Sequence, residues 1–249
     1  MTQTIALYSI KGGVGKTAAA VNLAHAAARD GHPTLLCDLD PQGAASYYFR
    51  VRSARKFGRK KLLKGGKGVD KHIKGTDYEG LDILPADFSY RKLDVALGDG
   101  SRKTLKEIFR HFHDDYEWVF IDCPPNITVL SENIFRAADR IVVPCIPTTL
   151  SALTYTKLLD FFAEEGLNRD KIIPFFSMVE SRKRMHREVI DALSGNAGYR
   201  FLSTAIPYLA EVERMGVTRM PVAAQHPSSR AARAYRELWL ELRGPHRSG

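Results

Sequence analysis

A glycine-rich loop between two contrasting segments constrains this chain more than any other feature. The loop, residues 10–17, reads Ile-Lys-Gly-Gly-Val-Gly-Lys-Thr. Residues 4–10 form a short apolar, β-branched run, whereas residues 18–28 are dense in helix formers and are soon followed by Gly31. We therefore predict a strand, a loop and a helix that ends at Gly31. The backbone N–H groups of such a loop can wrap an anion at the helix start.

The residue types within the loop match those of a phosphate-binding loop at all but one position. In such loops a lysine reaches the β- and γ-phosphates of a nucleotide, and the hydroxyl that follows ligates Mg²⁺. Lys16 and Thr17 fit these roles, whereas Ile10 stands where the first glycine is usual. The residues expected to surround the phosphates are Lys11, Gly12, Gly13, Val14, Gly15, Lys16, Thr17 and Ala18.

A second lysine, Lys11, lies in the loop where a phosphate-binding loop needs no charge. The backbone amides and the helix start already create a positive potential there, so a further cation without an anion would be repelled. A phosphate group, either of the chain's own ligand or of a partner's, explains Lys11 better than a solvated loop charge does.

The stretch Lys-Gly-Gly-Val-Gly-Lys-Thr resembles the deviant Walker A loop of the ParA/MinD family of P-loop ATPases. Residues 38–43, Asp-Leu-Asp-Pro-Gln-Gly, resemble the second acidic motif of that family, and residues 118–122 (WVFID) resemble its Walker B strand. The likeness covers most of the chain apart from about residues 50–80. Because the loop begins at residue 10, we expect a small ParA member without an N-terminal helix-turn-helix domain. The remaining strands and the closing helix are matched by residues 140–147, 203–207 and 234–242.

This resemblance implies ATP and Mg²⁺ as cofactors and a role for each polar residue. Lys16 would stabilise the γ-phosphoryl group, and Asp40 would orient or activate the attacking water. Thr17 would bind Mg²⁺ directly, while Asp38 and Asp122 would hold it through water molecules. Apart from the resemblance, two carboxylates two residues apart at a strand end, Asp38 and Asp40, can face the same side.

The resemblance also implies partners. Lys11 would act in catalysis by crossing to the nucleotide of a second subunit in an ATP-bound sandwich homodimer. Pro207 and its neighbours would line the adenine base. A cargo-linked partner protein, ParB-like or equivalent, would stimulate a weak intrinsic ATPase. The dimer would bind DNA nonspecifically and segregate a plasmid or a chromosome.

One departure from the family lies directly after Thr17, where a second hydroxyl is usual and this chain has Ala18. A lost hydrogen bond to an α-phosphate would cost on the order of 1 to 2 kcal/mol in nucleotide affinity. Binding itself is still expected, because the backbone donors remain.

Short apolar stretches alternate with helical ones along the whole chain. Strands are predicted near Ile5, Leu35, Leu81, Val119, Ile141, Ile173 and Phe201. This alternation predicts an α/β fold, a doubly wound and mostly parallel sheet flanked by helices, with ligands at the carboxyl ends of the strands. We expect one ATPase domain over residues 1–249. The absence of a signal peptide, of an apolar run long enough to span a membrane and of a Cys-x-x-Cys pair predicts a cytoplasmic protein without an iron–sulfur cluster.

The net charge of +9 is concentrated in two regions. Residues 50–74 carry eleven Lys and Arg against one acid, Asp70, and are too glycine-rich for a single helix. We expect this segment to be partly mobile when free and to bind the phosphate backbone of nucleic acid. A second basic region lies in the carboxyl-terminal third, where the family binds nucleoid DNA. The DNA candidates are Arg55, Lys56, Arg59, Lys60, Lys61, Arg182, Lys183, Arg184, Arg187 and Arg219.

Several alternatives remain open from the sequence. The same ATP cycle could position a protein cargo, such as carboxysomes or chemoreceptor clusters. Residues 229–243 are amphipathic and could attach to a membrane as in MinD-like relatives, although a last helix docked on the core has the same pattern. A metabolic P-loop enzyme such as a ligase would need neither Lys11 nor the basic segment.

Overall fold

The centre of the molecule is a single twisted sheet. The computed structural model describes residues 2–54, 57–98, 104–196 and 198–244. Seven strands follow the order β3-β4-β2-β5-β1-β6-β7, and all neighbours are parallel except β3, which is antiparallel to β4. The strands are β1 (Gln3–Leu7), β2 (Thr34–Asp38), β3 (Lys74–Gly75), β4 (Leu81–Leu84), β5 (Trp118–Asp122), β6 (Arg140–Cys145) and β7 (Ile172–Phe176).

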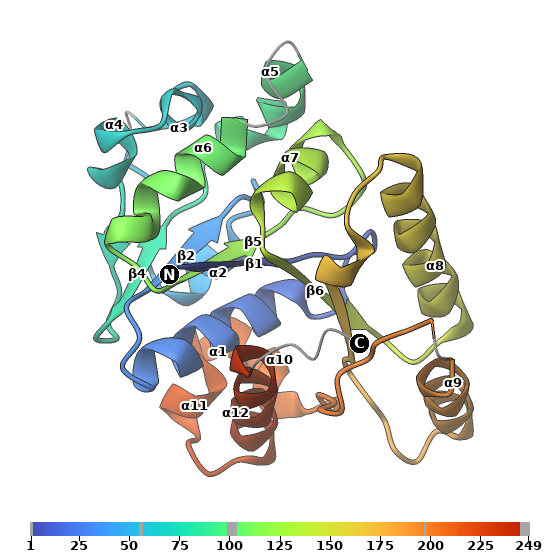
Figure 1. Ribbon diagram of the computed structural model, residues 1–249. Helices are drawn as coiled ribbons and strands as arrows, with labels where there is room; N and C mark the ends of the chain where they lie inside the picture. The colour runs from blue at the N-terminus through green and yellow to red at the C-terminus, as the bar shows by residue number, and fades with distance from the viewer. Residues whose placement is uncertain (1, 55–56, 99–103, 197, 245–249) are drawn as a thin grey trace.

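Helices cover both faces of this sheet (Figure 1). One face carries α1 (Lys16–Arg29), α2 (Ala44–Tyr48), α10 (Ala210–Thr218), α11 (Val222–Gln225) and α12 (Arg230–Arg243). The other carries α3 (Arg59–Lys64), α4 (Lys67–Asp70), α5 (Leu93–Gly98), α6 (Thr104–Arg110), α7 (Val129–Ala137) and α8 (Thr149–Glu164), and α9 (Arg184–Ser194) packs beside α8. Short 3-10 helices are η1 (Phe88–Lys92), η2 (His111–Asp114) and η3 (Arg169–Lys171). The predicted doubly wound α/β fold is confirmed.

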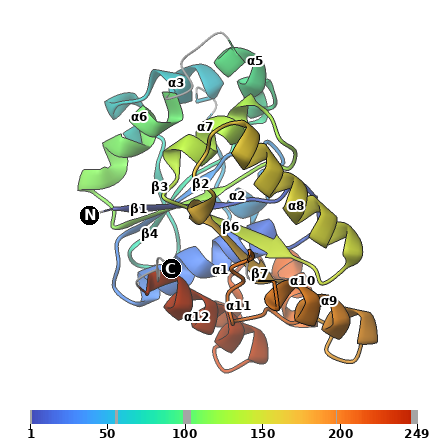
Figure 2. The same ribbon diagram turned by 45° about the vertical axis from the view of Figure 1, so that its right-hand side comes forward.

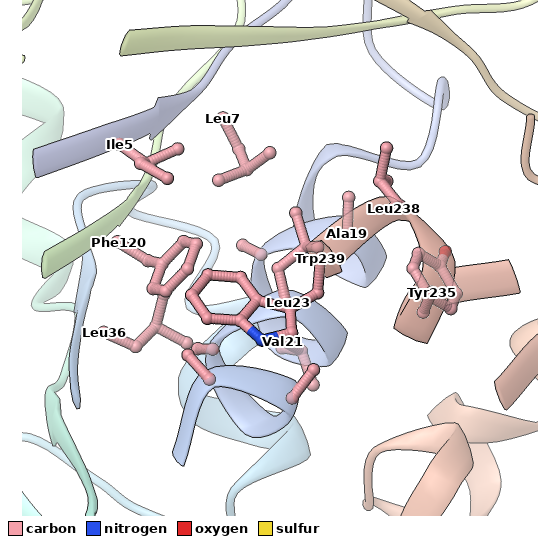
Figure 3. Close-up of a cluster of buried hydrophobic side chains, with 14 of the residues drawn as sticks. Ile5, Leu7, Ala19, Val21, Leu23, Leu36, Phe120, Tyr235, Leu238 and Trp239 are labelled. Atoms are coloured by element: carbon pink, nitrogen blue, oxygen red, sulfur yellow. The ribbon is translucent and has the colours of Figure 1, made fainter. Parts of the chain in front are cut away.

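The strands alternate their side chains between two cores. Ile5 and Leu7 of β1 point to the α1 side, whereas Ala6 points to the side of α5 to α8. Because both faces are covered, the strands read as continuous apolar runs. In Figure 3 the ring of Trp239 from α12 lies between Phe120 of β5 and the side chains of α1. Its indole N–H donates to Asp30 at 2.8 Å, which fixes the closing helix against the end of α1.

Six of the seven predicted strands are present, and the first helix ends as predicted, with Gly31 at φ 87°. The strand predicted near Phe201 is wrong. Ser203 and Thr204 give their backbone N–H groups to the Glu241 carboxylate of α12, at 2.7 and 2.9 Å, so they make no ladder with β7. Leu202 and Ile206, on either side, donate their backbone N–H groups to the β7 carbonyl oxygens of Pro174 and Phe176, both at 2.8 Å. An isolated bridge also joins Pro207 to Val179, but no continuous strand forms.

None of the described helices is both long enough and apolar enough to cross a bilayer. The amphipathic residues 229–243 form α12, whose apolar side is buried against α1. The structure therefore favours the core-docked alternative for this helix.

Candidate functional site

The carboxyl ends of three central strands bring the predicted polar residues together. In the parallel register, Asp38 of β2 lies opposite Asp122 of β5, and Leu7 of β1 lies opposite Asp122 on the other side. The loop of residues 10–17 begins shortly after β1 ends and enters α1 at Lys16. The loop and the carboxylates therefore lie together at the carboxyl ends of the strands, where ligands usually bind in such folds (Figure 1).

The loop needs glycine for its shape. Gly13 and Gly15 have φ angles of 73° and 92°, in the left-handed region that strains other residues. At Gly15 a Cβ atom would also lie 3.0 Å from the Ser177 hydroxyl, which follows β7. A side chain at this position would therefore be strained by the backbone angle and would also crowd the Ser177 hydroxyl.

Lys16 is a buried cation at the start of α1. Its ammonium group donates to the carbonyl oxygen of Lys11 at 3.1 Å, its one hydrogen bond within the described residues. Burial lowers its pKa, and the charge of Asp122 opposes that shift. An ammonium group has three donors, so Lys16 retains donors for an anion in the loop.

Lys11 is half-exposed at the rim of the loop. Its backbone N–H donates to the Ser9 hydroxyl at 3.3 Å, but its side chain makes no ion pair with any described residue. It borders a narrow cleft between the loop and α8, which is also lined by Ser151 and Tyr155. The position of its charge is compatible with an anion that approaches from outside the chain.

Two fully buried carboxylates face each other at the strand ends. Within the described residues, neither oxygen of Asp122 nor Oδ1 of Asp38 has a hydrogen-bond partner. Burial raises the pKa of Asp38 to about 6. Burial, followed by the charge of Asp38, raises the pKa of Asp122 well above its usual value, although the nearby Thr17 and Lys16 oppose the shift. Such a pair is costly when ionised and is relieved by a cation.

The donor set fits a hydrated Mg²⁺ rather than a fully protein-bound metal. Carboxylate and hydroxyl oxygens are the ligands that Mg²⁺ prefers, and it usually keeps several waters. The described residues contain no group of three or more His, Cys, Asp or Glu side chains placed to hold a metal. The orphaned oxygens of Asp38 and Asp122, with the Thr17 hydroxyl beside them, could instead accept from waters on the ion.

Ser46 in α2 holds Asp38 in place. Its backbone N–H and its hydroxyl both donate to Oδ2 of Asp38, at 2.8 and 2.7 Å. The same hydroxyl accepts from the backbone N–H of Ala86, at 2.9 Å, so its own hydrogen is directed to Asp38. This arrangement leaves Oδ1 of Asp38 free. Sequence reasoning missed Ser46, because a serine eight positions after an aspartate gives no signal of contact.

Asp40 lies in the tight turn that follows β2. One of its carboxylate oxygens accepts from the backbone N–H of Gln42 at 2.9 Å, and its carbonyl oxygen accepts from Gly43. Its charge is close enough to affect the pKa values of Lys16, Asp38 and Asp122. The turn thus brings Asp40 into the cluster that the sequence predicted.

Ala18 and Pro207 lie in different parts of the fold. Ala18 lies in the first turn of α1 and packs partly against the core. Pro207 pairs with Val179, two residues after Ser177. Sequence reasoning also missed the nearness of Ser177 to Gly15, because Ser177 follows a strand that is far away in the chain.

The predicted DNA residues do not form one surface. Arg55 and Lys56 lie outside the described residues, whereas Arg59, Lys60 and Lys61 form the start of α3. The second group lies before and in α9, where Lys183 and Arg184 pair with Glu180 and Glu188. Arg219 stands apart from both groups: its guanidinium lies 4.4 Å from the Tyr47 ring centre and donates to the Tyr47 carbonyl oxygen.

Known proteins similar to this chain share its length and fold. A family model described as an AAA domain matches residues 2–170. The chain is 35% identical to the chromosome-partitioning ATPase Soj of Thermus thermophilus, over 96% of this chain and 94% of the relative. It is 30% identical to Soj of Treponema pallidum, over 97% of both. A structure of cobyrinic acid a,c-diamide synthase from Mycobacterium smegmatis, with ADP and magnesium, is 26% identical with a TM-score of 0.81 over 97% of this chain and 94% of that one.

Proposed function

The chain belongs to the ParA/MinD family of P-loop ATPases, and on that premise we propose that it is a Mg²⁺-dependent partition ATPase. In this proposal it dimerises on ATP, binds DNA without sequence preference as the dimer, and moves or segregates a plasmid or chromosome. A partner protein stimulates hydrolysis, which separates the dimer and ends the ATP-dependent part of the DNA binding. The observation that carries the proposal is the buried pair of Asp38 and Asp122 opposite a phosphate-binding loop that holds two lysines.

The loop supports ATP binding through its backbone donors and Lys16. Bound Mg²⁺ would neutralise negative charge that develops on the phosphate oxygens. Thr17 offers a direct ligand, and Asp38 and Asp122 offer acceptors for water. Asp40, whose carboxylate accepts from Gln42 in the turn after β2, would orient the attacking water. The protein's contribution is therefore positioning and charge stabilisation.

The free charge of Lys11 supports the sandwich dimer. Its side chain has no described ionic partner within its own chain and is half-exposed. A second subunit's nucleotide would supply the missing anion, which makes ATP binding and dimerisation one event. The relatives from Thermus and Treponema are named as chromosome-partitioning ATPases, which supports DNA segregation as the purpose of the cycle.

Asp40→Ala is expected to uncouple DNA binding from release. Loss of the residue that positions water should slow hydrolysis by at least about a hundredfold, the usual scale for a missing catalytic base. ATP dimers should still form, so the variant should stay on random duplex DNA longer than the parent chain. Phosphate release and fluorescence anisotropy of labelled DNA measure the two steps.

Asp77→Ala is a matched control, because Asp77 is exposed and pairs only with Arg50 among the described residues. It should hydrolyse ATP like the parent.

The DNA affinity of the ATP-bound parent chain is expected to fall steeply as salt is added. The slope of log K against log salt should be about −0.9 for each DNA phosphate that the protein neutralises. A flat salt response would argue against the DNA assignment.

Ser46→Ala is expected to reduce the increase in ADP affinity that Mg²⁺ produces. The variant loses a hydrogen bond to an ionised carboxylate and leaves the Ala86 N–H without its acceptor. A hydrogen bond to a charged group contributes ~1.5 kcal/mol. If this contribution is lost from Mg²⁺ binding, the gain in ADP affinity on adding Mg²⁺ should be about tenfold smaller than in the parent. Titration calorimetry with ADP, in the presence and absence of Mg²⁺, measures this gain.

Ser131→Ala serves as the control for that measurement. Ser131 is equally buried and belongs to the hydrogen-bonded cap of α7, away from Asp38. It should lower thermal stability while leaving the Mg²⁺ effect unchanged. If Ser46→Ala and Ser131→Ala behave alike, Ser46 has only a structural role.

A further inference from the structure

Six exposed basic side chains gather on neighbouring helices of the face opposite α1 and α12. We name this surface the basic platform. None of its members pairs with a described carboxylate. The platform consists of Lys60, Lys61 and Lys64 on α3, Lys71 at the end of α4, and Lys106 and Arg110 on α6.

Apolar contacts make these helices one surface. Leu62 of α3 and Val69 of α4 are fully buried in the same core as Ile108 of α6. Gly65, between α3 and α4, has φ 60°, and a Cβ there would lie 3.2 Å from Ile108. Figures 1 and 2 both show α3 beside α6. Lys106 and Arg110, distant in sequence, thereby join the lysines of α3.

Two acids lie among these six basic residues, Asp70 of α4 and Glu107 of α6. Asp70, the one acid in residues 50–74, bonds to the ring of His111 at 2.9 Å. The exposed Glu107 of α6 makes no ion pair with a described residue. Burial and then the charges of Lys61, Lys74 and Lys71 lower the pKa of His72. The platform is therefore a region of unbalanced positive charge, which favours a polyanion.

From this placement we infer that the basic platform binds the phosphate backbone of duplex DNA in the single chain, without ATP. The inference rests on the proposed DNA function and adds a second, independent surface to it. The α3–α4 segment precedes β3 directly, and α9 follows β7, the strand at the opposite edge of the sheet. At ~4.8 Å between neighbouring strands, these two edges lie on the order of 30 Å apart.

The platform is suited to backbone contact rather than to base stacking. Phe57, the aromatic residue nearest in sequence to α3, is buried and stacks on His72 with ring centres 4.2 Å apart. It therefore offers no face to an unpaired base, as single-strand recognition usually requires. Lysine side chains on a convex helical surface neutralise phosphates without reading sequence.

The test compares two triple variants of the whole chain that remove equal charge. One is Lys60→Gln, Lys61→Gln and Lys64→Gln on the platform, and the other is Arg182→Gln, Arg184→Gln and Arg187→Gln near α9. Fluorescence anisotropy with random-sequence duplex measures Kd without nucleotide and with ATP, over a range of salt, and thermal melting checks that both variants fold. The platform variant should lose at least about tenfold in nucleotide-free affinity, and its salt slope should flatten by about 2 to 3. The α9 variant should lose mainly the increment due to ATP.

An unchanged Kd and salt slope of the platform variant without nucleotide would overturn the inference. Displacement of the duplex by single-stranded RNA at a much lower phosphate concentration would also overturn it. If ATP fails to raise the DNA affinity of the parent chain, but the platform variant still loses nucleotide-free binding, the ATP-gated function fails and the platform stands.

Discussion

Lys16→Ala is expected to abolish measurable binding of both ATP and ADP. The ammonium group is buried at the start of α1 and holds the loop through the Lys11 carbonyl. The variant would lose that contact as well as up to two charge-assisted hydrogen bonds to phosphate, because the ammonium group has three donors. At ~1.5 to 3 kcal/mol for each bond to a charged group, affinity should fall by at least about a hundredfold. Titration calorimetry with ADP and with a slowly hydrolysed ATP analogue measures the loss.

Lys171→Ala is the matched control for this prediction. Lys171 is also a partly buried lysine that donates to a backbone carbonyl, that of Ala138 at 2.7 Å, but it lies at the other end of β7 from Ser177. Its loss should lower stability and leave nucleotide affinity intact. ADP binding by Lys16→Ala within a fewfold of the parent would show that the loop does not hold phosphate through this residue.

Lys11→Ala is expected to separate nucleotide binding from dimerisation. The side chain makes no described ion pair within its own chain, so its removal should leave ADP binding by the monomer close to that of the parent. In the proposed sandwich it contacts the second subunit's nucleotide in a water-poor interface, where a missing cation leaves phosphate charge unpaired. Truncating one side of such a contact costs ~2 to 5 kcal/mol, so ATP dimers should weaken by about thirtyfold or more.

Light scattering with a slowly hydrolysed ATP analogue measures the dimer directly. Lys157→Ala is the control, since Lys157 is an exposed lysine on α8 outside the loop. It should dimerise like the parent. Full ATP-dependent dimerisation by Lys11→Ala would refute the sandwich assignment while leaving the role of Lys16 untouched.

Local features of the sequence were sufficient for most of the fold. The glycine positions, the apolar run before them and the helix formers after them each act over a few residues, so the loop could be placed from sequence alone. The covered strands read as apolar runs for a similarly local reason. No continuous strand forms near Phe201, because a distant residue, Glu241, takes the backbone donors of Ser203 and Thr204. The pairing with β7 is thereby limited to Leu202 and Ile206 on either side.

The sequence indicated which acidic residues lie at the candidate site, but not how they contact one another. Asp38, Asp40 and Asp122 follow apolar strands, which indicates a shared edge. Their register is a property of the sheet: Asp38 lies opposite Asp122 only because β2 and β5 pair in parallel. The hydrogen bond from the Ser46 hydroxyl to Asp38 forms only because a turn joins β2 to α2. The backbone N–H of Ala86, which orients that hydroxyl, comes from the segment after β4.

The sequence by itself determined the phosphate loop, the acidic strand ends, the doubly wound fold and the charge excess in residues 50–74. Each of these features depends on residues that are close together in the chain. Tertiary structure alone decided which charged side chains lie near one another. It placed Lys106 and Arg110 of α6 beside α3, bound Arg219 to Tyr47, and put α9 at the far edge of the sheet. Packing of apolar faces fixes these positions, and apolar packing joins segments that are distant in the chain.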